Sequence, residues 1–499
     1  SENLMKNLFI LLLIFLNIAT YSKSDDFFED ITYQILENQP RLSYGVSVSD
    51  VNNDGNFEFI VTGFGFNNLA LAHKKGILFN SINQSIFIDK NRKTIGVASC
   101  DIDQDGYEEI YFLNTDTYSG NKRYSDRLLD FDGNKFFDLF ELEINQENLN
   151  LTAGRSVVCV DRNGNGAYGI YVANYGGPTR FYEKDGNEII DKASELGIDK
   201  ITGGRAVISG NILSGRSDIF AANERGENFL YYNNNGNFVE LAKDYAVDDT
   251  FQNGRGTALS DIYYRGRLDI LTSNWEGPHR AFVLKNNKFV DIADKQFSAP
   301  SRIRTVISAD FDNDGYDEVF MNNIGEPNKL FKILDNGEFK EINIGNALEI
   351  NGLGTGAAVA DIDGDGILEL LISHGESGYQ PLTLYKANSK KNNFLRIKPI
   401  NMHGAPARGA TVTLVSNLRT HSKTIDSGSG YLCQMEPVAH YGIRKNEKNI
   451  KISVTWTNGK KDIFEVKNLN KTLEVKQNNW SFYEKIFIYN MHCIFSFVL

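Results

Sequence analysis

The sequence contains little cysteine, and its four cysteines lie far apart. None forms a Cys-x-x-Cys pair, which excludes a zinc ribbon, and their number is too low for a small disulfide-rich scaffold. The cysteines could form one or two disulfides or remain buried free thiols. The cellular compartment decides which form persists, so both possibilities remain. The four positions are Cys100, Cys159, Cys433 and Cys493.

Basic residues are also in the minority. Lys and Arg number 52 against 64 Asp and Glu, which gives a formal net charge of -12. Proteins that bind nucleic acid need basic patches to meet the phosphate backbone, so a general nucleic-acid partner is excluded. A solvated acidic surface and carboxylates neutralised by bound metal both remain as explanations of the charge.

Motifs of hydrolytic enzymes are missing as well. The chain has only seven His, and none lies in an HExxH or similar metal-catalytic spacing. The stretch 375–378 is one residue short of a GxSxG nucleophile elbow. We therefore expect no catalytic residues. His279, His374 and His440 lie in motif-like stretches, where a structural role and a place in a site are both open.

The chain contains no confident membrane span. A basic start, an apolar segment at 8–16 and small residues at 20–22 form the pattern of a secretory signal peptide, too short for a span. We predict that 1–22 comprises this signal peptide and a short upstream extension, with a buried or membrane-anchoring helix as the alternative. We interpret the apolar tail 478–499 as a mispredicted end, with a weak membrane anchor as the alternative.

What the sequence does contain is a repeat of about fifty residues. Loops rich in Asp, Asn and Gly begin at residues 50, 101, 161, 210, 261, 310 and 361, which are 51, 60, 49, 51, 49 and 51 residues apart. Short apolar segments flank each loop, and four such segments per unit are typical of a β-propeller blade. A flat solenoid would need capping repeats, and none is found. We predict an all-β protein: a seven-bladed propeller over 40–390 and a small C-terminal β-domain over 391–477.

Four of the seven loops carry oxygen ligands at alternating positions. Each has Asp at position one, Asp or Asn at three, Asp at five, Gly at six and Glu at nine. Ca2+ prefers six to eight oxygens, the Gly permits the sharp turn, and position seven contributes its backbone carbonyl. An EF-hand would instead place its acid at position twelve, between helices. The predicted ligands of about four Ca2+ ions are Asp50, Asn52, Asp54, Asn56, Glu58, Asp101, Asp103, Asp105, Tyr107, Glu109, Asp310, Asp312, Asp314, Tyr316, Glu318, Asp361, Asp363, Asp365, Ile367 and Glu369.

The other three loops have lost part of this pattern. Gly169 stands at position nine of the loop that begins at Asp161. The other two loops have unsuitable side chains in or beside their ligand positions, namely Leu213, Arg216, Tyr263 and Arg265. We expect all three to hold their turns by hydrogen bonds or through Arg side chains, without calcium.

The four intact loops resemble the FG-GAP repeats of integrin α-subunit propellers. The stretches 407–412, 427–433 and 436–442 resemble the ASPIC/UnbV module, and 456–460 closes it with Thr where that family usually has Pro. Within the propeller, residues 274–280 are similar to the cartilage acidic protein family. This resemblance covers almost the whole mature chain. It implies a secreted, glycosylated, calcium-binding matrix protein with no established catalytic reaction.

We therefore predict an extracellular matrix or cell-surface interaction protein whose partner is an extracellular protein or glycan. The alternative is an extracellular carbohydrate-active enzyme that uses the propeller channel. Four arginines, Arg155, Arg205, Arg255 and Arg304, recur a few residues before the loops of four successive blades. Two roles remain open for these arginines. They could form a positive ring that binds an anionic glycan or acidic peptide, or they could bond to carbonyls and carboxylates between blades. The N-glycosylation triplets begin at Asn83, Asn150, Asn470 and Asn479.

Overall fold

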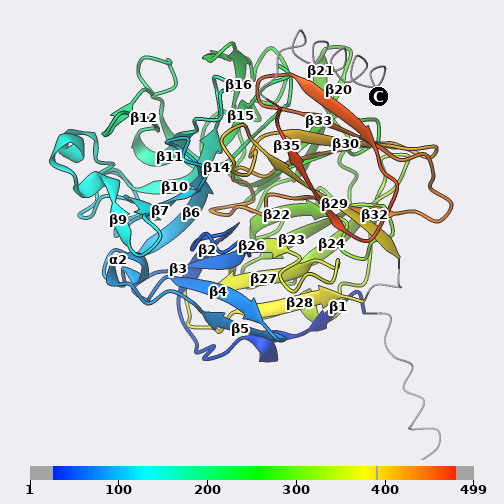
Figure 1. The fold of residues 1–499 in the computed structure, drawn as a ribbon, viewed down its shortest axis with the longest axis horizontal. Coiled ribbons are helices and arrows are strands. Elements are labelled where there is room, and N and C mark those ends of the chain that lie inside the picture. Colours follow the sequence, from blue (N-terminus) through cyan, green and yellow to red (C-terminus); the bar gives the residue numbers. More distant parts are fainter. Residues whose placement is uncertain (1–25, 389–391, 479–499) are drawn as a thin grey trace, which may run out of the picture.

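The structure is a computed structural model that describes residues 26–388 and 392–478, and it is built almost entirely of β-strands (Figure 1). The all-β class predicted from the repeat is therefore confirmed. The predicted signal peptide, 1–22, lies outside the described residues, as does all but the first residue of the apolar tail 478–499. Among the described residues, no helix has the length and apolar character that a membrane crossing requires.

Seven four-stranded antiparallel units follow one another between residues 28 and 387, and pairing of Tyr175 with Gly203 joins the third and fourth units into one eight-stranded sheet. Six are continuous in sequence: β2 (Ser43–Ser49), β3 (Glu58–Gly63), β4 (Leu69–Lys74) and β5 (Ile77–Asn80); β6 (Thr94–Cys100), β7 (Glu109–Asn114), β8 (Arg127–Phe131) and β9 (Phe136–Asp138); β10 (Gly154–Val160), β11 (Gly169–Pro178), β12 (Arg180–Asp185) and β13 (Glu188–Asp191); β14 (Ile201–Gly210), β15 (Asp218–Asn223), β16 (Phe229–Asn234) and β17 (Asn237–Glu240); β18 (Gly254–Ser260), β19 (Asp269–Asn274), β20 (Arg280–Lys285) and β21 (Lys288–Asp291); β22 (Ile303–Ala309), β23 (Glu318–Asn323), β24 (Lys329–Ile333) and β25 (Phe339–Glu341). The seventh combines β26 (Gly354–Ala360), β27 (Glu369–His374) and β28 (Thr383–Ala387) with the N-terminal β1 (Phe28–Asp30), which pairs with β28.

The first strand of each unit lies on the inside of a closed ring. Each inner strand contacts the next, and β2 contacts both β6 and β26, which closes the circle. Closure removes the exposed inner edge that an open sheet would leave. The approach is close: a Cβ added to Gly356 of β26 would lie 2.2 Å from the backbone oxygen of Tyr44 in β2. Glycine at this position therefore lets the seventh blade meet the first.

The remaining strands form a separate two-sheet domain, drawn in orange and red in Figure 1. Its strands are β29 (Asn393–Ile400), β30 (Thr411–Val415), β31 (Thr420–Thr424), β32 (Ala439–Ile443), β33 (Lys451–Thr455), β34 (Lys461–Glu465) and β35 (Thr472–Lys476). One sheet has the order β32-β29-β35 and the other β31-β30-β33-β34. Leu395, Val412, Tyr441 and Trp456 are buried between them, as in other packed sheet pairs.

Helical structure is limited to short connections in the described chain. These are the 3-10 turns η1 (Thr32–Gln34), η2 (Leu139–Glu141), η3 (Glu143–Asn148) and η4 (Asn346–Leu348) and the α-helix α2 (Ser85–Ile88).

The loop between β31 and β32 enters the centre of the propeller, and we call residues 426–436 the plug loop. The side-chain oxygen of Gln434 accepts hydrogen bonds from the Ser47 hydroxyl (3.0 Å) and the Ser99 N–H (2.9 Å). Gly430 exchanges two backbone hydrogen bonds with Thr257, of 2.7 and 2.9 Å. Because these partners belong to β2, β6 and β18, the plug loop contacts inner strands on opposite sides of the ring.

Candidate metal centres

The four intact loops lie at the same end of their inner strands, between β2 and β3, β6 and β7, β22 and β23, and β26 and β27. In each, the Asp at position one directly follows the inner strand and the Glu at position nine begins the next strand. Gly55, Gly106, Gly315 and Gly366, at position six, have φ angles of 89°, 96°, 85° and 84°. This left-handed conformation favours glycine, which explains why every loop carries one there.

Backbone N–H groups hold the carboxylates in the same way in all four loops. The N–H of the Gly at position six donates to the Asp at position one over 2.7, 3.1, 3.0 and 3.0 Å. The N–H of position two donates to the Glu at position nine over 3.1, 2.7, 3.1 and 2.9 Å. At least one oxygen of each carboxylate is thereby fixed. In Asp50 and Asp101 the second oxygen also accepts from a backbone N–H of the loop, at 3.0 and 2.6 Å.

Three of the four loops bring acids together into groups whose carboxylate oxygens lie within 4.8 Å of one another. The groups are Asp101, Asp103 and Glu109; Asp310, Asp312 and Glu318; and Asp361, Asp363 and Asp365. In the first loop, two ligand positions are Asn, and the amide nitrogen of Asn56 donates to Asp54 over 2.9 Å. No group of three acids was found there among the described residues.

At position seven of the other three intact loops, the backbone carbonyl is the available ligand. The side chain of Tyr107 is exposed, that of Ile367 packs against the apolar core, and the hydroxyl of Tyr316 donates to Asp335 over 3.0 Å. These side chains make contacts away from the loop acids. That position seven contributes its carbonyl to a bound ion stays a prediction.

The loop residues fit a hard divalent cation. Asp310 Oδ1 and Asp361 Oδ1 are buried and have no hydrogen-bond partner within the described chain. Burial raises the pKa of Asp101 to about 7 and that of Glu58 and Glu369 to about 8. Carboxylates in such surroundings resist ionisation unless positive charge compensates them. An all-oxygen, acidic donor set of this kind suits Ca2+.

Calcium-depleted protein is therefore expected to lose stability as the pH rises from about 5 to about 8. In the unfolded chain these acids titrate near pH 4, so between that pH and the raised folded pKa the folded state binds more protons, and rising pH favours unfolding. Calcium binds the deprotonated acids and should oppose this loss. Unfolding temperatures at pH 5.5 and 7.5, with and without calcium, test it; identical pH profiles in the two conditions would contradict the assignment.

Two lysines lie directly across the sheet from the Glu at position nine. Lys332 pairs in register with Glu318, and its Nζ lies 3.0 Å from that carboxylate and 3.3 Å from Asp312. Lys386 occupies the equivalent place in the seventh blade, with its Nζ 2.7 Å from Asp363. Each ammonium group lowers the net negative charge of its loop.

The second loop has the most acidic surroundings, although Lys184 Nζ lies 3.2 Å from Asp103. Asp130 lies beside Leu129, which pairs with Ile110, and so stands across from Glu109. Burial raises the pKa of Asp130 to about 6, with Asp103 and Asp105 adding to the effect. Because ligand charge tunes calcium affinity, this loop is the strongest candidate for a tight site.

The C-terminal domain sits on the loop end of the propeller, a placement that sequence reasoning missed. At position eight of the second loop, Glu108 pairs with the fully buried Arg408. At position eight of the third intact loop, which begins at Asp310, Asp317 accepts hydrogen bonds from His421 (3.1 Å) and Lys423 (2.6 Å). A signal was present: only these two loops have a second acid directly before the Glu at position nine.

The Asp at position one also contacts the C-terminal domain in several blades. Asp310 Oδ2 accepts from the N–H of Gly442 over 2.8 Å, and Asp361 Oδ2 lies 3.3 Å from Arg396 Nε. These aspartates therefore connect the candidate metal loops to the domain that covers them.

The three incomplete loops hold their turns by hydrogen bonds. Asp218 accepts from three successive backbone N–H groups at 3.2, 2.7 and 2.9 Å. Asp161 accepts from the Thr457 hydroxyl (2.6 Å) and Asp261 from the Ser422 N–H (3.0 Å), both in the C-terminal domain. The Arg265 guanidinium stacks on Tyr263. The Arg216 guanidinium donates to the carbonyl oxygen of Asn163 over 3.3 Å. Backbone hydrogen bonds and Arg side chains therefore both contribute to these turns, and the absence of calcium stays a prediction.

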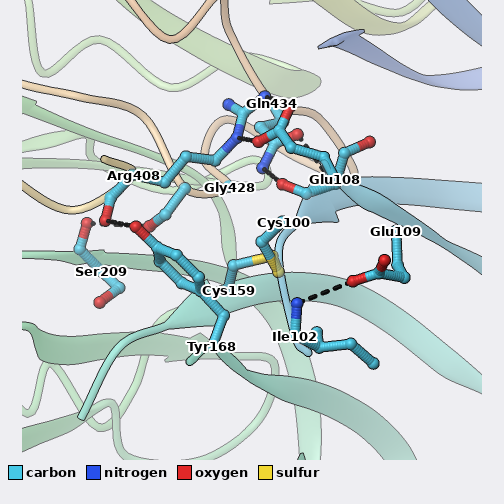
Figure 2. Close-up of a disulfide and its surroundings, with 12 residues drawn as sticks. Cys100, Ile102, Glu108, Glu109, Cys159, Tyr168, Ser209, Arg408, Gly428 and Gln434 are labelled. Carbon is cyan, nitrogen blue, oxygen red and sulfur yellow. Dashed lines mark hydrogen bonds and ion pairs between the residues drawn. A yellow bond between two sulfur atoms is a disulfide. The ribbon is translucent and has the colours of Figure 1, made fainter. Parts of the chain in front are cut away.

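A disulfide joins the second and third blades next to the second loop (Figure 2). Cys100, the last residue of β6, is bonded to Cys159 of β10 with an S–S distance of 2.07 Å. Cys433 in the plug loop is a buried free thiol, and Cys493 lies outside the described residues. Both states left open by the sequence thus occur in the described chain.

The three histidines singled out in the sequence are buried and hydrogen-bonded. The partners of Nε2 are Ser301 for His279 (3.1 Å), Glu349 for His374 (2.9 Å) and Asn313 for His440 (2.6 Å). The four repeated arginines gather at the end of the inner strands away from the loops, where they line one cavity of about 670 Å³. No histidine is among the described residues that line it.

Comparison with known proteins identifies relatives of both parts of the chain. Residues 402–481 match the ASPIC and UnbV family, and residues 261–321 and 310–372 match an FG-GAP-like repeat. The chain is 44% identical over 483 residues to cartilage acidic protein 1 of Xenopus tropicalis, covering 88% of this chain and 74% of that protein. It is 44% identical over 498 residues to cartilage acidic protein 1 of Homo sapiens, covering 91% and 75%. These matches confirm the resemblance drawn from the motifs.

Proposed function

The chain belongs to the cartilage acidic protein family, and from this premise we propose that it is a secreted, calcium-binding β-propeller that acts as an interaction protein of the extracellular matrix or cell surface. The names of its relatives support a matrix protein and not an enzyme. The observation that carries the calcium assignment is the set of loops on one face, whose buried acids are held in place by backbone N–H groups.

Calcium binding would support the docking of the C-terminal domain. Bound Ca2+ would supply the positive charge that the buried acids need. In Asp310 and Asp361 the Oδ2 atom accepts from the loop glycine and also contacts the C-terminal domain, while Oδ1 has no hydrogen-bond partner within the described chain. An ion that fixes these side chains should also favour the docked domain, because each event stabilises the conformation that the other requires.

Secretion is supported by the disulfide and by two of the glycosylation triplets. A structural disulfide such as Cys100–Cys159 persists in oxidising compartments. Asn83 and Asn470 are exposed, as an N-glycan requires. Asn150 is fully buried and hydrogen-bonded to Asp126 and Asn174, so we exclude it as an acceptor.

The partner is expected at the rim that the C-terminal domain leaves uncovered. The loop face is occupied by that domain, and the plug loop fills the centre of the ring. An extracellular protein or glycan would therefore approach the rim where the arginine-lined cavity opens.

Expression of the full chain in a secreting animal cell tests this function. We expect the protein in the medium, with glycans on Asn83 and Asn470, and with up to four Ca2+ ions per chain after removal of loosely bound metal. An Asn150→Gln variant serves as a glycosylation control that should not change the glycan mass. Retention of the protein in the cytosol would contradict secretion, and a metal-free secreted protein would contradict calcium binding.

A further inference from the structure

The cavity at the uncovered rim is built by the inner strands themselves. Arg155, Arg255 and Arg304 are the second residues of β10, β18 and β22, and Arg205 lies in the first half of β14. The metal loops follow the last residues of such strands, so the cavity lies at the opposite end. Its volume of about 670 Å³ is in the range of sites for small molecules, and Tyr431 of the plug loop is among its lining residues.

Positive charge is in excess in the buried part of this cavity. The four arginines are 6, 4, 5 and 7% exposed, and Glu224, at 7%, is the buried carboxylate that lines the cavity with them. Glu224 pairs with Arg205 and lies 3.3 Å from Arg255. Glu376, which pairs with Arg304, has a side chain 44% exposed.

Two of the four arginines have incomplete hydrogen-bond or charge partners. Arg155 donates to the carbonyl oxygens of Gly154 and Tyr118, and no carboxylate within the described chain forms an ion pair with it. Arg255 donates to Gly254, and its Nε is buried without a hydrogen-bond partner within the described residues. Burying incompletely compensated charge is strongly unfavourable, and Arg255 shares its one carboxylate, Glu224, with Arg205. This arrangement is therefore suited to an anion supplied from outside.

Aromatic rings surround the same guanidinium groups. Arg205 lies 4.6 Å from the centre of the Tyr175 ring and Arg304 4.3 Å from the centre of the Trp275 ring, with Arg255 at 5.3 Å from Trp275. Although burial raises the pKa of Tyr431, the four guanidinium groups together lower it below its ordinary value. A ligand here meets positive charge and flat apolar surfaces at once.

We propose that this cavity binds an acidic saccharide, with a carboxylate or sulfate group at Arg155 and Arg255 and the sugar ring against Trp275. A compact cavity with a floor formed by the plug loop suits one or two sugar rings. An extended acidic peptide would favour a groove with a free strand edge, and the inner strands here are enclosed within the ring. The proposal rests on the extracellular location proposed above. Because saccharide binding is measured on purified protein, a failure to bind the saccharide would leave the proposals of secretion and calcium binding untouched.

Calorimetric titration of the full secreted protein with a sulfated uronate disaccharide tests the proposal. We expect binding that weakens with added salt, and at least tenfold weaker binding of the neutral disaccharide of the same size. Equal affinity for both sugars, no binding of either, or binding of a short polyglutamate peptide in preference to the sugar would overturn it. Binding of inorganic sulfate alone, without a gain from the sugar ring, would also overturn the saccharide assignment.

Arginine variants distinguish a role in saccharide binding from a role in stability, because affinity and unfolding temperature are measured on the same protein. Arg255→Met should weaken disaccharide binding at least tenfold. The unfolding temperature of the free protein should stay unchanged or rise, because the variant removes a buried charge whose one carboxylate, Glu224, keeps its pairing with Arg205. Arg302→Met is the matched control: its guanidinium also lies near Trp275, but the side chain is 46% exposed and outside the cavity lining. Should Arg255→Met fail to fold, Arg155→Met decides by the same measurements. A folded variant with full affinity contradicts the proposal.

Discussion

Removal of calcium is expected to lower the unfolding temperature of the full chain more than any single surface substitution. An ion that binds only the folded loop stabilises it by about 2.7 kcal/mol at a hundredfold excess over its dissociation constant. Several independent loops would together contribute on the order of 10 kcal/mol. The measurement is thermal unfolding in calcium and in excess chelator, with the bound ions counted on the same sample.

Single-loop variants assign the effect to particular sites. Glu109→Gln replaces the buried acid at position nine of the second loop by a neutral side chain of the same shape. The variant should bind one Ca2+ ion fewer and show a smaller calcium-dependent rise in unfolding temperature. Glu143→Gln makes the same chemical change at an exposed position outside the loops and should leave both unchanged. Full stability in chelator, with no ion bound, would mean that the loops are turns only.

The repeat made the propeller and its loops predictable because their geometry is local. Position six must be Gly where φ is positive, and an acid must return at position nine where the next strand begins, so the pattern can be read within nine residues. The same locality explains why the three incomplete loops could be separated from the four intact ones.

The surroundings of the loops could not be predicted in this way. Lys332 and Lys386 reach the acids from the third strand of their blades, a register that the sequence does not specify. Arg408 meets Glu108 across 300 residues of chain, and no periodicity relates the two. The four cavity arginines are an intermediate case. Their recurrence can be read in the sequence, but their burial and the unpaired Nε of Arg255 are known only from the structure.

Substitution of Arg408 is expected to release the C-terminal domain from the propeller. Its side chain is fully buried, pairs with Glu108, and donates to the carbonyl oxygens of Val48 (2.8 Å) and Asp426 (2.8 Å). Because Val48 and Glu108 belong to the propeller and Asp426 to the plug loop, this one guanidinium joins both parts. Figure 2 shows its pairing with Glu108. Arg408→Met leaves Glu108 buried without its partner, which typically costs about 3–5 kcal/mol.

The free thiol of Cys433 reports on this release. Burial raises its pKa to about 11, so it should resist thiol reagents while the plug loop is seated. In a Cys493→Ser background, Arg408→Met should make Cys433 reactive at temperatures where the propeller is still folded. Arg265→Met, an exposed arginine whose backbone bridges to Thr420 of the same domain, should leave the thiol protected.

The double variant Arg408→Met, Glu108→Leu distinguishes a lost ion pair from a general packing defect. Replacing both members of a buried pair by apolar groups is far less unfavourable than removing one, so the double variant should regain part of the lost stability and thiol protection. If it is no better than Arg408→Met alone, the hydrogen bonds to Val48 and Asp426 hold the domain in place. An unreactive thiol and unchanged unfolding in Arg408→Met would mean that the plug loop is held without Arg408, by contacts such as those of Gln434 and Gly430.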